Sequence, residues 1–241
     1  MPGSLKTEGI VLRTLRYGEA DRILHLYTPD RGRVSAIAKG VRRARSRFGG
    51  RLEPFFRLSL VLYEGRSDLL TVTSAETLAA HPRLREHSAG LEGAARACEA
   101  VARVFDDGDP HPGVYHLLAN QLVLLDSDPG RAGRANSLAF RLKLLLAAGF
   151  APHLAGCASC GEREHLAGFS GAAGGVVCSA CEANAFPLDQ DAHDFLVAAL
   201  GRPLAEAPDA EPRALAQAER AILETLEHHG GVRLRPAGAL R

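Results

Sequence analysis

The chain of 241 residues has no run of about 18 apolar residues, the length that a membrane-spanning helix needs. Its longest apolar stretch, residues 142–150, is too short and contains Lys143. The first residues, MPGSLKTEG, lack the apolar core of a signal peptide. These absences predict a cytoplasmic protein with no membrane partner.

Common sequence signatures of catalysis are lacking too. There is no GxxxxGK[ST] nucleotide-binding loop, no HExxH motif and no GxSxG nucleophile elbow. Asp106, Asp107 and Asp109 gather near Gly108, where the end of a predicted helix favours a polar loop over a nuclease-type metal site. The sequence therefore predicts no enzymatic activity and no small-molecule substrate.

Charge is present in almost equal amounts of both signs, but it is distributed unevenly. The whole chain carries +1. Residues 1–80 hold fourteen Lys/Arg against eight Asp/Glu (+6), residues 81–156 hold eight of each, and residues 157–241 hold seven against twelve (−5). The first third should attract an anionic polymer, and the last third should not.

The positive charge is concentrated in the segment KGVRRARSRFGGR, which has no acidic residue. Its six cations are Lys39, Arg42, Arg43, Arg45, Arg47 and Arg51. This density favours binding to the phosphates of a nucleic acid over a merely solvated loop. Phosphate contacts do not distinguish DNA from RNA. Phe48, next to Arg47, is the first candidate for a side chain that stacks on a base.

Five segments of the first 80 residues have the alternation and the turn signals of β-strands. They are 7–16, 20–28, 33–38, 58–65 and 69–76. The last two are joined by a predicted turn at 65–68, and the one long connection is the basic one, between the third and fourth strands. The pattern predicts a small closed β-barrel, and a barrel of OB type binds single strands. Its other candidate aromatic platforms are Tyr17, Tyr27, Phe55, Phe56 and Tyr63, of which we expect Tyr27, Tyr63 and at least one phenylalanine in the core.

After Ala75 the apolar spacing becomes helical. Helices are predicted over 91–105, 114–125, 135–148, 189–200 and 211–229. Asn136 or Ser137 is a predicted N-cap, Gly149 a C-terminal stop, and Cys98 a small buried residue. The expected domains are a barrel over 1–80, a helical domain over 81–152, a cysteine segment over 153–185, and C-terminal helices over 186–241 that pack on the helical domain.

Four of the five cysteines form two CxxC pairs, Cys157 with Cys160 and Cys178 with Cys181, seventeen residues apart. This spacing is typical of a zinc ribbon. Four thiolates saturate a tetrahedral zinc ion and leave no position for water or substrate, which predicts a structural site. Gly161 suits a knuckle with positive φ, and Gly174 with Gly175 suits the turn of a small hairpin. The nearby His153, His165 and His193 are not needed as ligands.

Three longer stretches of the chain carry a resemblance to a known family. The stretch EGIVLRTLRYGEADRILHLYTPDRGRVSAIAKGVRRARSRFGGRLEPF is similar to the start of the bacterial RecO family of recombination mediators. FRLKLLLAAGFAPHLAGCASCG and GGVVCSAC are similar to their last long helix and their zinc segment. The resemblance covers nearly the whole chain and is weakest over 81–130 and after 182.

The resemblance implies an OB fold followed by a helical domain, and a protein that binds single- and double-stranded DNA and anneals complementary strands without ATP. With RecR, such a protein helps RecA load onto strands covered by single-strand-binding protein. Matching the chain to the family residue by residue implies that the DNA contacts include Lys39, Arg42, Arg43 and Arg47. Because all four cysteines are kept, one structural zinc ion per chain is favoured.

Two other functions fit the residues. An RNA-binding factor could combine the barrel with the zinc ribbon, and a protein-interaction adaptor could recruit basic partners through the acidic last third. The helical middle is also a candidate binding site for the tail of single-strand-binding protein. Its candidate cations are Arg131, Arg134, Arg141 and Lys143.

Overall fold

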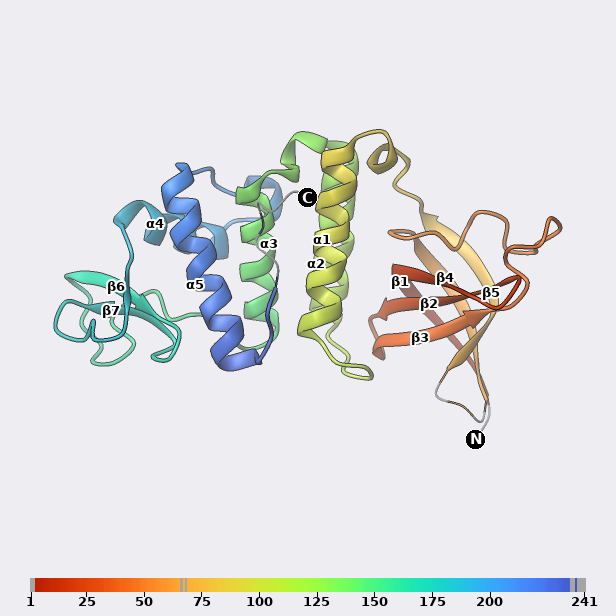
Figure 1. Cartoon of the computed structure of the whole chain (residues 1–241), viewed down its shortest axis with the longest axis horizontal. Helices are drawn as coiled ribbons and strands as arrows, with labels where there is room; N and C mark the ends of the chain where they lie inside the picture. Colours follow the sequence, from red (N-terminus) through yellow and green to blue (C-terminus); the bar gives the residue numbers. More distant parts are fainter. Residues whose placement is uncertain (1–2, 66, 68, 235–236, 238–241) are drawn as a thin grey trace. The chain divides into compact units, whose positions relative to one another are not determined.

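The structure, a computed structural model, describes residues 3–65, 67, 69–234 and 237. The chain forms two compact units, residues 1–129 and 130–241. In the described residues, the first unit holds a five-stranded barrel and two long helices, and the second holds three long helices and a small sheet (Figure 1). The predicted combination of an N-terminal barrel with helices and a cysteine segment is confirmed.

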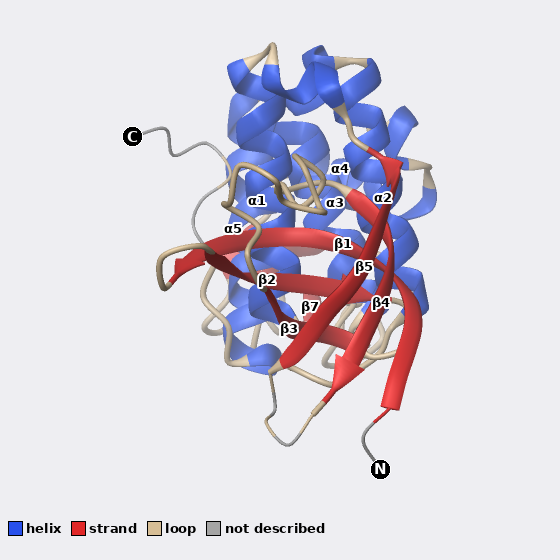
Figure 2. Ribbon diagram, turned by 90° about the vertical axis from the view of Figure 1, so that its right-hand side faces the viewer, coloured by secondary structure: helices blue, strands red, loops and turns tan. Residues whose placement is uncertain are grey.

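The barrel is closed, with the strand order β1-β2-β3-β5-β4 (Figure 2). Its strands are β1 (Gly3–Tyr17), β2 (Asp21–Thr28), β3 (Gly32–Ala38), β4 (Arg57–Glu64) and β5 (Leu70–Ala79). All neighbouring pairs are antiparallel except β3 and β5, which are parallel. This five-stranded barrel is an OB fold. The predicted hairpin of β4 and β5 is confirmed, and Arg66 and Asp68 of its turn lie outside the described residues.

The barrel interior is filled by side chains that alternate along the strands. Leu58, Leu60 and Leu62 of β4 are fully buried, and the residues between them are more exposed. Burying such a side chain stabilises the fold by about 1.5–3 kcal/mol. The alternation also fixes the register, because a slip of one residue would turn all three leucines to the other face.

Helices α1 (Ser88–Val104) and α2 (Pro112–Ser127) follow the barrel within the first unit, close to the predicted ranges. Cys98 of α1 is buried as predicted, and burial raises the pKa of its thiol to about 12. The connection after α1 is fastened to the barrel, because the Gly108 N–H donates to the Arg33 carbonyl over 3.1 Å. The Phe105 ring meets the buried Tyr27 ring edge-on, with 6.0 Å between centroids.

In the second unit, α3 packs against α4 and α5, and two short strands form a hairpin. The elements are α3 (Arg134–Ala147), β6 (Leu166–Ser170), β7 (Gly175–Cys178), β8 (Phe186–Pro187), α4 (Gln190–Gly201) and α5 (Pro212–Gly230). Three short 3₁₀ helices complete the described chain: Pro82–Arg85 in the first unit, and Pro129–Ala132 and Leu204–Glu206.

The ends of α3 test two sequence predictions. Gly149 follows the helix with φ +80°, which confirms it as the C-terminal stop. The predicted N-cap was wrong, because Gly133 occupies that position and Asn136 and Ser137 lie inside the helix. Asn136 is instead buried, and its side-chain amide donates to the Leu204 carbonyl over 3.2 Å. Among the described helices, none combines the length and the hydrophobicity that crossing a bilayer requires.

Candidate nucleic-acid interface and metal centre

The segment from Lys39 to Arg51, here called the basic loop, connects β3 to β4 as predicted. It is a chain of consecutive turns rather than an extended strand. The N–H groups of Arg43, Ser46, Gly49 and Arg51 each donate to the carbonyl three residues earlier, over 3.0–3.4 Å. Gly40 and Gly49 adopt φ +66° and +54°, which glycine allows without strain. The loop is therefore compact and internally bonded.

Apolar side chains anchor this loop in the barrel. Val41, Phe48 and Leu52 are 8%, 2% and 1% exposed and belong to the barrel's core cluster. The prediction that Phe48 stacks on a base was therefore wrong: a ring so buried has no face for a base. Its neighbour Arg47 covers it instead, with the guanidinium carbon 4.8 Å from the ring centroid. The physical reason is that a long loop needs burial to hold one conformation.

Polar contacts fasten the base of the loop to the turn between β1 and β2. The Gly40 N–H donates to Asp21 Oδ1 over 2.7 Å, and the Arg42 N–H donates to the Ala20 carbonyl over 2.9 Å. Glu53, just beyond the loop, forms an ion pair of 2.7 Å with Arg22 of β2. Sequence analysis missed these partners, since only the fold brings residues 20–22 beside 40–53.

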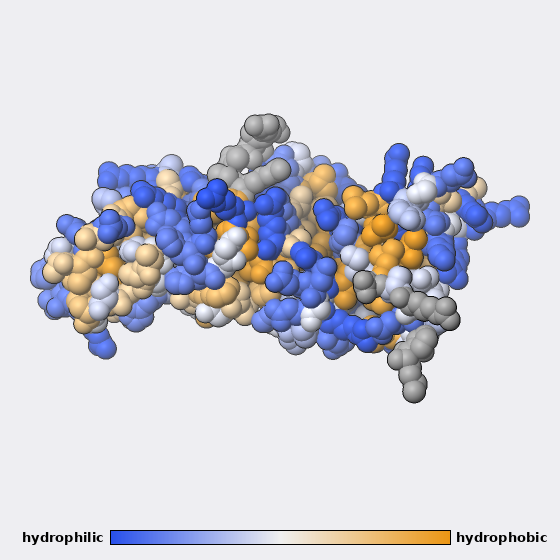
Figure 3. Space-filling model, turned by 60° about the horizontal axis from the view of Figure 1, so that its bottom comes forward, coloured by the Kyte–Doolittle hydropathy of each residue, from blue (hydrophilic) through white to orange (hydrophobic). Residues whose placement is uncertain are grey.

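The six cations of the basic loop all lie on its exposed side. Arg47 donates to the Val72 carbonyl over 3.3 Å, and Arg51 to the Arg47 carbonyl over 3.3 Å. Within the described residues, the side chains of Lys39, Arg42, Arg43 and Arg45 have no hydrogen-bond or ion-pair partner. Hydrophilic atoms project from the barrel where this loop lies (Figure 3). The loop thus presents a concentrated positive charge with no internal counter-charge.

The other aromatic side chains of the barrel divide between core and surface. Tyr27 and Phe55 are buried, as predicted. Tyr63 is 42% exposed, so its prediction as a core residue was wrong. Tyr17, at the end of β1, is 54% exposed. Tyr17 lies opposite Asp21 of β2, and Asp21 binds Gly40 of the basic loop, so Tyr17 replaces Phe48 as the exposed aromatic side chain near that loop.

The four paired cysteines converge on one point of the second unit. The sulfur atoms of Cys157, Cys160, Cys178 and Cys181 all lie within 4.8 Å of one another, and those of Cys160 and Cys178 are 3.7 Å apart. A tetrahedron with metal–sulfur distances of ~2.3 Å has edges of about 3.8 Å. The geometry and the soft thiolate donors fit a closed four-coordinate site that could hold a metal ion.

Two backbone turns shape these cysteine knuckles. The Gly161 N–H donates to the Cys157 carbonyl over 2.8 Å, and the Cys181 N–H to the Cys178 carbonyl over 2.9 Å. Gly161 has φ +83° and Gly174 has φ +80°, which confirms both glycine predictions. Cys178 ends β7, so the β6–β7 hairpin sets the position of the second pair.

The pKa values of the thiols indicate that the four sulfur atoms are not all deprotonated in the absence of a cation. Backbone N–H groups, first that of Cys178, lower the pKa of the Cys157 thiol to about 6. Hydrogen bonds to the thiols of Cys160 and Cys178 raise the pKa of Cys181 to about 12. Four sulfur atoms this close cannot all carry negative charge by themselves, and a bound divalent cation removes that conflict.

The cations predicted near α3 are mostly used inside the second unit. Arg134 and Arg141 both face the buried Glu219 of α5, at 2.6 Å and 3.6 Å. Lys143 donates to the Leu200 carbonyl over 3.0 Å, and burial lowers its pKa. These three side chains therefore hold α3 to its neighbours, and Arg141, only 4% exposed, is wrong as a surface contact.

Two family models and several curated relatives match most of this chain, and all of them carry the same protein description. The family model described as recombination protein O N terminal matches residues 1–81, and the one described as recombination protein O C terminal matches residues 89–236. A DNA repair protein RecO from Rubrobacter xylanophilus is 42% identical over 227 residues, which cover 90% of this chain and 88% of the relative.

Two further relatives carry the same description. A DNA repair protein RecO from Anaeromyxobacter sp. strain K is 37% identical and covers 95% of this chain and 93% of its own. The one from Geobacter sulfurreducens is 37% identical, with 82% of this chain and 81% of its own covered. The strand order of the barrel, the cysteine cluster and these matches lead to one conclusion: this chain belongs to the RecO family of DNA repair proteins.

Proposed function

We propose that this protein is a non-enzymatic recombination mediator that binds single- and double-stranded DNA and anneals complementary strands. The observation that carries the proposal is the basic loop: six exposed cations on an anchored scaffold, four of them without a partner in the described chain. Together with RecR, the protein would assist RecA loading onto strands coated by single-strand-binding protein. The description of the relatives as DNA repair proteins supports DNA over RNA as the polymer.

The proposed mechanism of annealing is electrostatic. Two complementary strands repel each other through their phosphates, and cations that neutralise those phosphates lower this barrier. Because the loop is held by buried Val41, Phe48 and Leu52, its charges are already assembled before DNA arrives. Binding then loses little conformational entropy in the loop itself.

The division of labour along the chain is part of the proposal. Residues 1–80 would carry the DNA contacts, through Lys39, Arg42, Arg43, Arg45, Arg47 and Arg51. The helical domain over 81–152 and the C-terminal helices over 186–241 would serve protein partners. The cysteine segment over 153–185 would hold one structural zinc ion, since a closed four-thiolate site leaves no position for a substrate. The place of action would be the cytoplasm, at the nucleoid.

The salt dependence of binding tests the electrostatic part. If six phosphates are neutralised, the slope of log K against log salt should be about −4 for single strands and about −5 for duplex. The double substitution Lys39→Glu/Arg43→Glu should flatten the slope and lower the affinity about 100-fold or more at low salt. A double substitution of two exposed arginines outside the loop, Arg83→Glu/Arg202→Glu, changes the net charge equally and should have a much smaller effect.

Strand annealing tests the functional part. Two complementary labelled oligonucleotides, mixed at several salt concentrations, should anneal faster with the wild type and with the Arg83/Arg202 variant than without protein. The Lys39/Arg43 variant should lose most of this acceleration. A salt slope near zero for the wild type, or equal annealing by both double variants, would refute the proposed role of the loop.

A further inference from the structure

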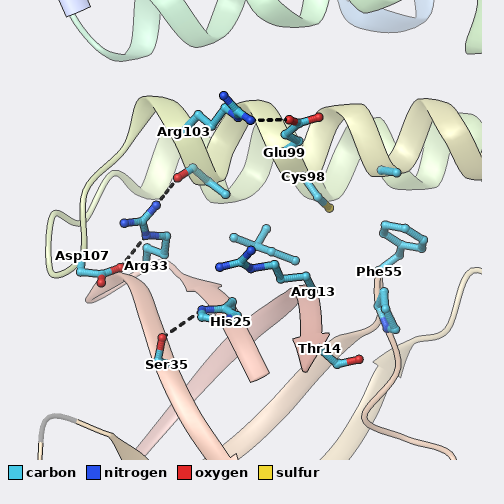
Figure 4. Close-up of a pocket in the computed structure, with 14 residues that line it drawn as sticks. Arg13, Thr14, His25, Arg33, Ser35, Phe55, Cys98, Glu99, Arg103 and Asp107 are labelled. Atoms are coloured by element: carbon cyan, nitrogen blue, oxygen red, sulfur yellow. Dashed lines mark hydrogen bonds and ion pairs between the residues drawn. The ribbon is translucent and has the colours of Figure 1, made fainter. Parts of the chain in front are cut away.

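A cavity of about 680 Å³ lies within the first unit, between the outer face of β1, β2 and β3 and the helix α1 (Figure 4). Its volume falls in the range of sites that hold small organic groups. Gly108 and Asp107, just after α1, bond to β3 and hold this end of the connection against the strand. The cavity is thus formed by elements of one compact unit.

The strand register shows what the barrel contributes to the cavity. Arg13 of β1 lies directly opposite His25 of β2, which lies opposite Ser35 of β3. Directly opposite residues share one face of an antiparallel pair. The next row on this face, two residues along, is Leu15, Ile23 and Ile37, and the third row begins with Tyr17 and Asp21. One face therefore passes from a polar row through an apolar row to an exposed aromatic ring.

This face ends at the basic loop. Asp21, in the third row, accepts the hydrogen bond of the Gly40 N–H. From the Arg13 row to the Tyr17 row is four residues, or about 13 Å at strand rise. That distance equals about four nucleotides at the stacked spacing of 3.4 Å. A strand held by the basic loop could therefore reach the cavity within a few nucleotides.

The cavity offers two chemically different walls. Phe55 and Cys98 supply apolar surface, and Arg13, Arg33 and Arg103 supply positive charge (Figure 4). Arg33 pairs with Asp107 and Arg103 with Glu99. Arg13 is exposed, and its guanidinium has no hydrogen-bond or ion-pair partner within the described residues. Arg13 is therefore the cation of this wall that an incoming anion could engage without breaking an ion pair.

His25 gives the cavity a neutral polar group. Its Nδ1 lies 3.0 Å from the Ser35 hydroxyl, while its buried Nε2 has no hydrogen-bond partner in the described chain. Burial, reinforced by the charge of Arg13, lowers the pKa of this imidazole, so it is uncharged at neutral pH. A buried polar atom without a partner calls for an explanation, and a hydrogen bond to water or to a bound group is one.

We infer that this cavity takes one unstacked base of a bound DNA strand, with Arg13 on an adjoining phosphate. A nucleotide matches the walls better than an acidic peptide does, because it combines a flat apolar face, a hydrogen-bonding edge and one negative charge. The inference rests on the proposed function, since it places a strand that the basic loop first attracts. It adds a contact to the base itself, which the loop's phosphate contacts cannot provide.

Filling the cavity tests this directly. Ala95 of α1 lines the cavity and is exposed, so Ala95→Phe should occupy the space of a base with little effect on folding. Ala89→Phe, on an exposed residue of the same helix that does not line the cavity, is the matched control. For each protein, the affinity for an oligothymidylate would be compared with that for an abasic backbone of equal length and charge. Thermal unfolding of each variant verifies its fold.

The wild type and Ala89→Phe should prefer the base-bearing strand by about tenfold, as expected for one stacked base. Ala95→Phe should lose most of this preference while keeping the wild-type salt slope. Arg13→Ala should weaken both oligonucleotides alike, and more than Arg16→Ala, an exposed neighbour on β1 that does not line the cavity.

Other outcomes separate the two proposals. If Ala95→Phe keeps both the salt slope and the base preference, the cavity holds no base, while DNA binding by the loop stands. If the wild type binds neither oligonucleotide, the proposed function itself fails. A third outcome is that an acidic peptide binds the wild type but not the Ala95→Phe variant, while this variant still prefers the base-bearing strand. The cavity is then a protein-docking site, and the inference is overturned.

Discussion

The basic loop and the two cysteine knuckles are both built from backbone turns, and they are held in place by different means. The loop is anchored from inside the barrel by Val41, Phe48 and Leu52, which leaves its charged side chains outside. The cysteine knuckles have only a small apolar cluster of their own, around Val177, and converge through their sulfur atoms. The loop thus folds without using the charge of its four unpartnered cations. The knuckles instead bring their thiols together at one point.

The largest effect should come from the cysteine cluster. If the cluster holds a metal ion, Cys178→Ser removes one of its four ligands and a residue that ends β7, so the variant should bind less metal and lose at least about 5 kcal/mol of stability. Metal content per chain and thermal unfolding measure both. Cys98→Ala is the control, because this buried cysteine lies outside the cluster and its loss should leave the metal content unchanged. If the Cys178→Ser variant still bound one metal ion per chain and kept the wild-type melting temperature, the cysteine cluster would not be what holds the knuckles in place.

The next effect tests the anchor of the loop. Phe48→Ala should lower the free energy of unfolding by about 3–5 kcal/mol, because it leaves a cavity in the barrel core. Phe48→Leu keeps an apolar anchor and should cost about 1–2 kcal/mol. Urea unfolding gives these values, and fluorescence anisotropy gives the DNA affinity, which should stay within about twofold in the leucine variant. A large loss of affinity in Phe48→Leu would restore the ring as a stacking side chain.

A smaller effect should follow from the polar fastening at the base of the loop. Asp21→Ala removes the acceptor of the Gly40 N–H and should cost about 1 kcal/mol. Asp21→Asn keeps an oxygen at that position and should recover most of the loss. Hydrogen exchange of the Gly40 amide reports the contact directly, and it should quicken in the alanine variant. Equal exchange in all three proteins would show that the apolar anchors hold the loop without this bond.

The smallest effect separates two arginines of the same loop. Arg47 covers the Phe48 ring and donates to a carbonyl of β5, whereas Arg45 has no partner in the described chain. Arg47→Lys should therefore cost about 0.5 kcal/mol of stability through loss of the planar contact. Arg45→Lys should cost nothing measurable, and both should bind DNA alike because the charge is kept. If Arg47→Lys bound DNA more weakly than Arg45→Lys but was equally stable, Arg47 would be assigned to a DNA contact instead.

The sequence predicted the elements well because their signals are local. Strand alternation, helical spacing, the glycine stops and the two CxxC pairs are all readable within a few residues, and the structure confirms them. Phe48, Tyr63 and Asn136 were misassigned because their surroundings depend on distant residues. A phenylalanine among arginines looks exposed until the fold places it over the end of the barrel. The cavity beside α1 could not be predicted from the sequence for the same reason, because its lining residues come from two distant ranges, 12–55 and 95–107.

The single parallel pair of the barrel has a consequence for how the protein folds. In the part of the chain that the structure describes, β3 meets β5 at two register positions, Ala36 with Leu70 and Ile37 with Thr71. This short seam closes the barrel, and it can form only after the chain has crossed the whole basic loop and β4. Loop closure over such a span is entropically slow, and mutual repulsion of the six cations makes it slower. The antiparallel hairpins should therefore form before the long-range β1–β4 and β3–β5 pairings, and a polyanion present during folding would accelerate these later steps.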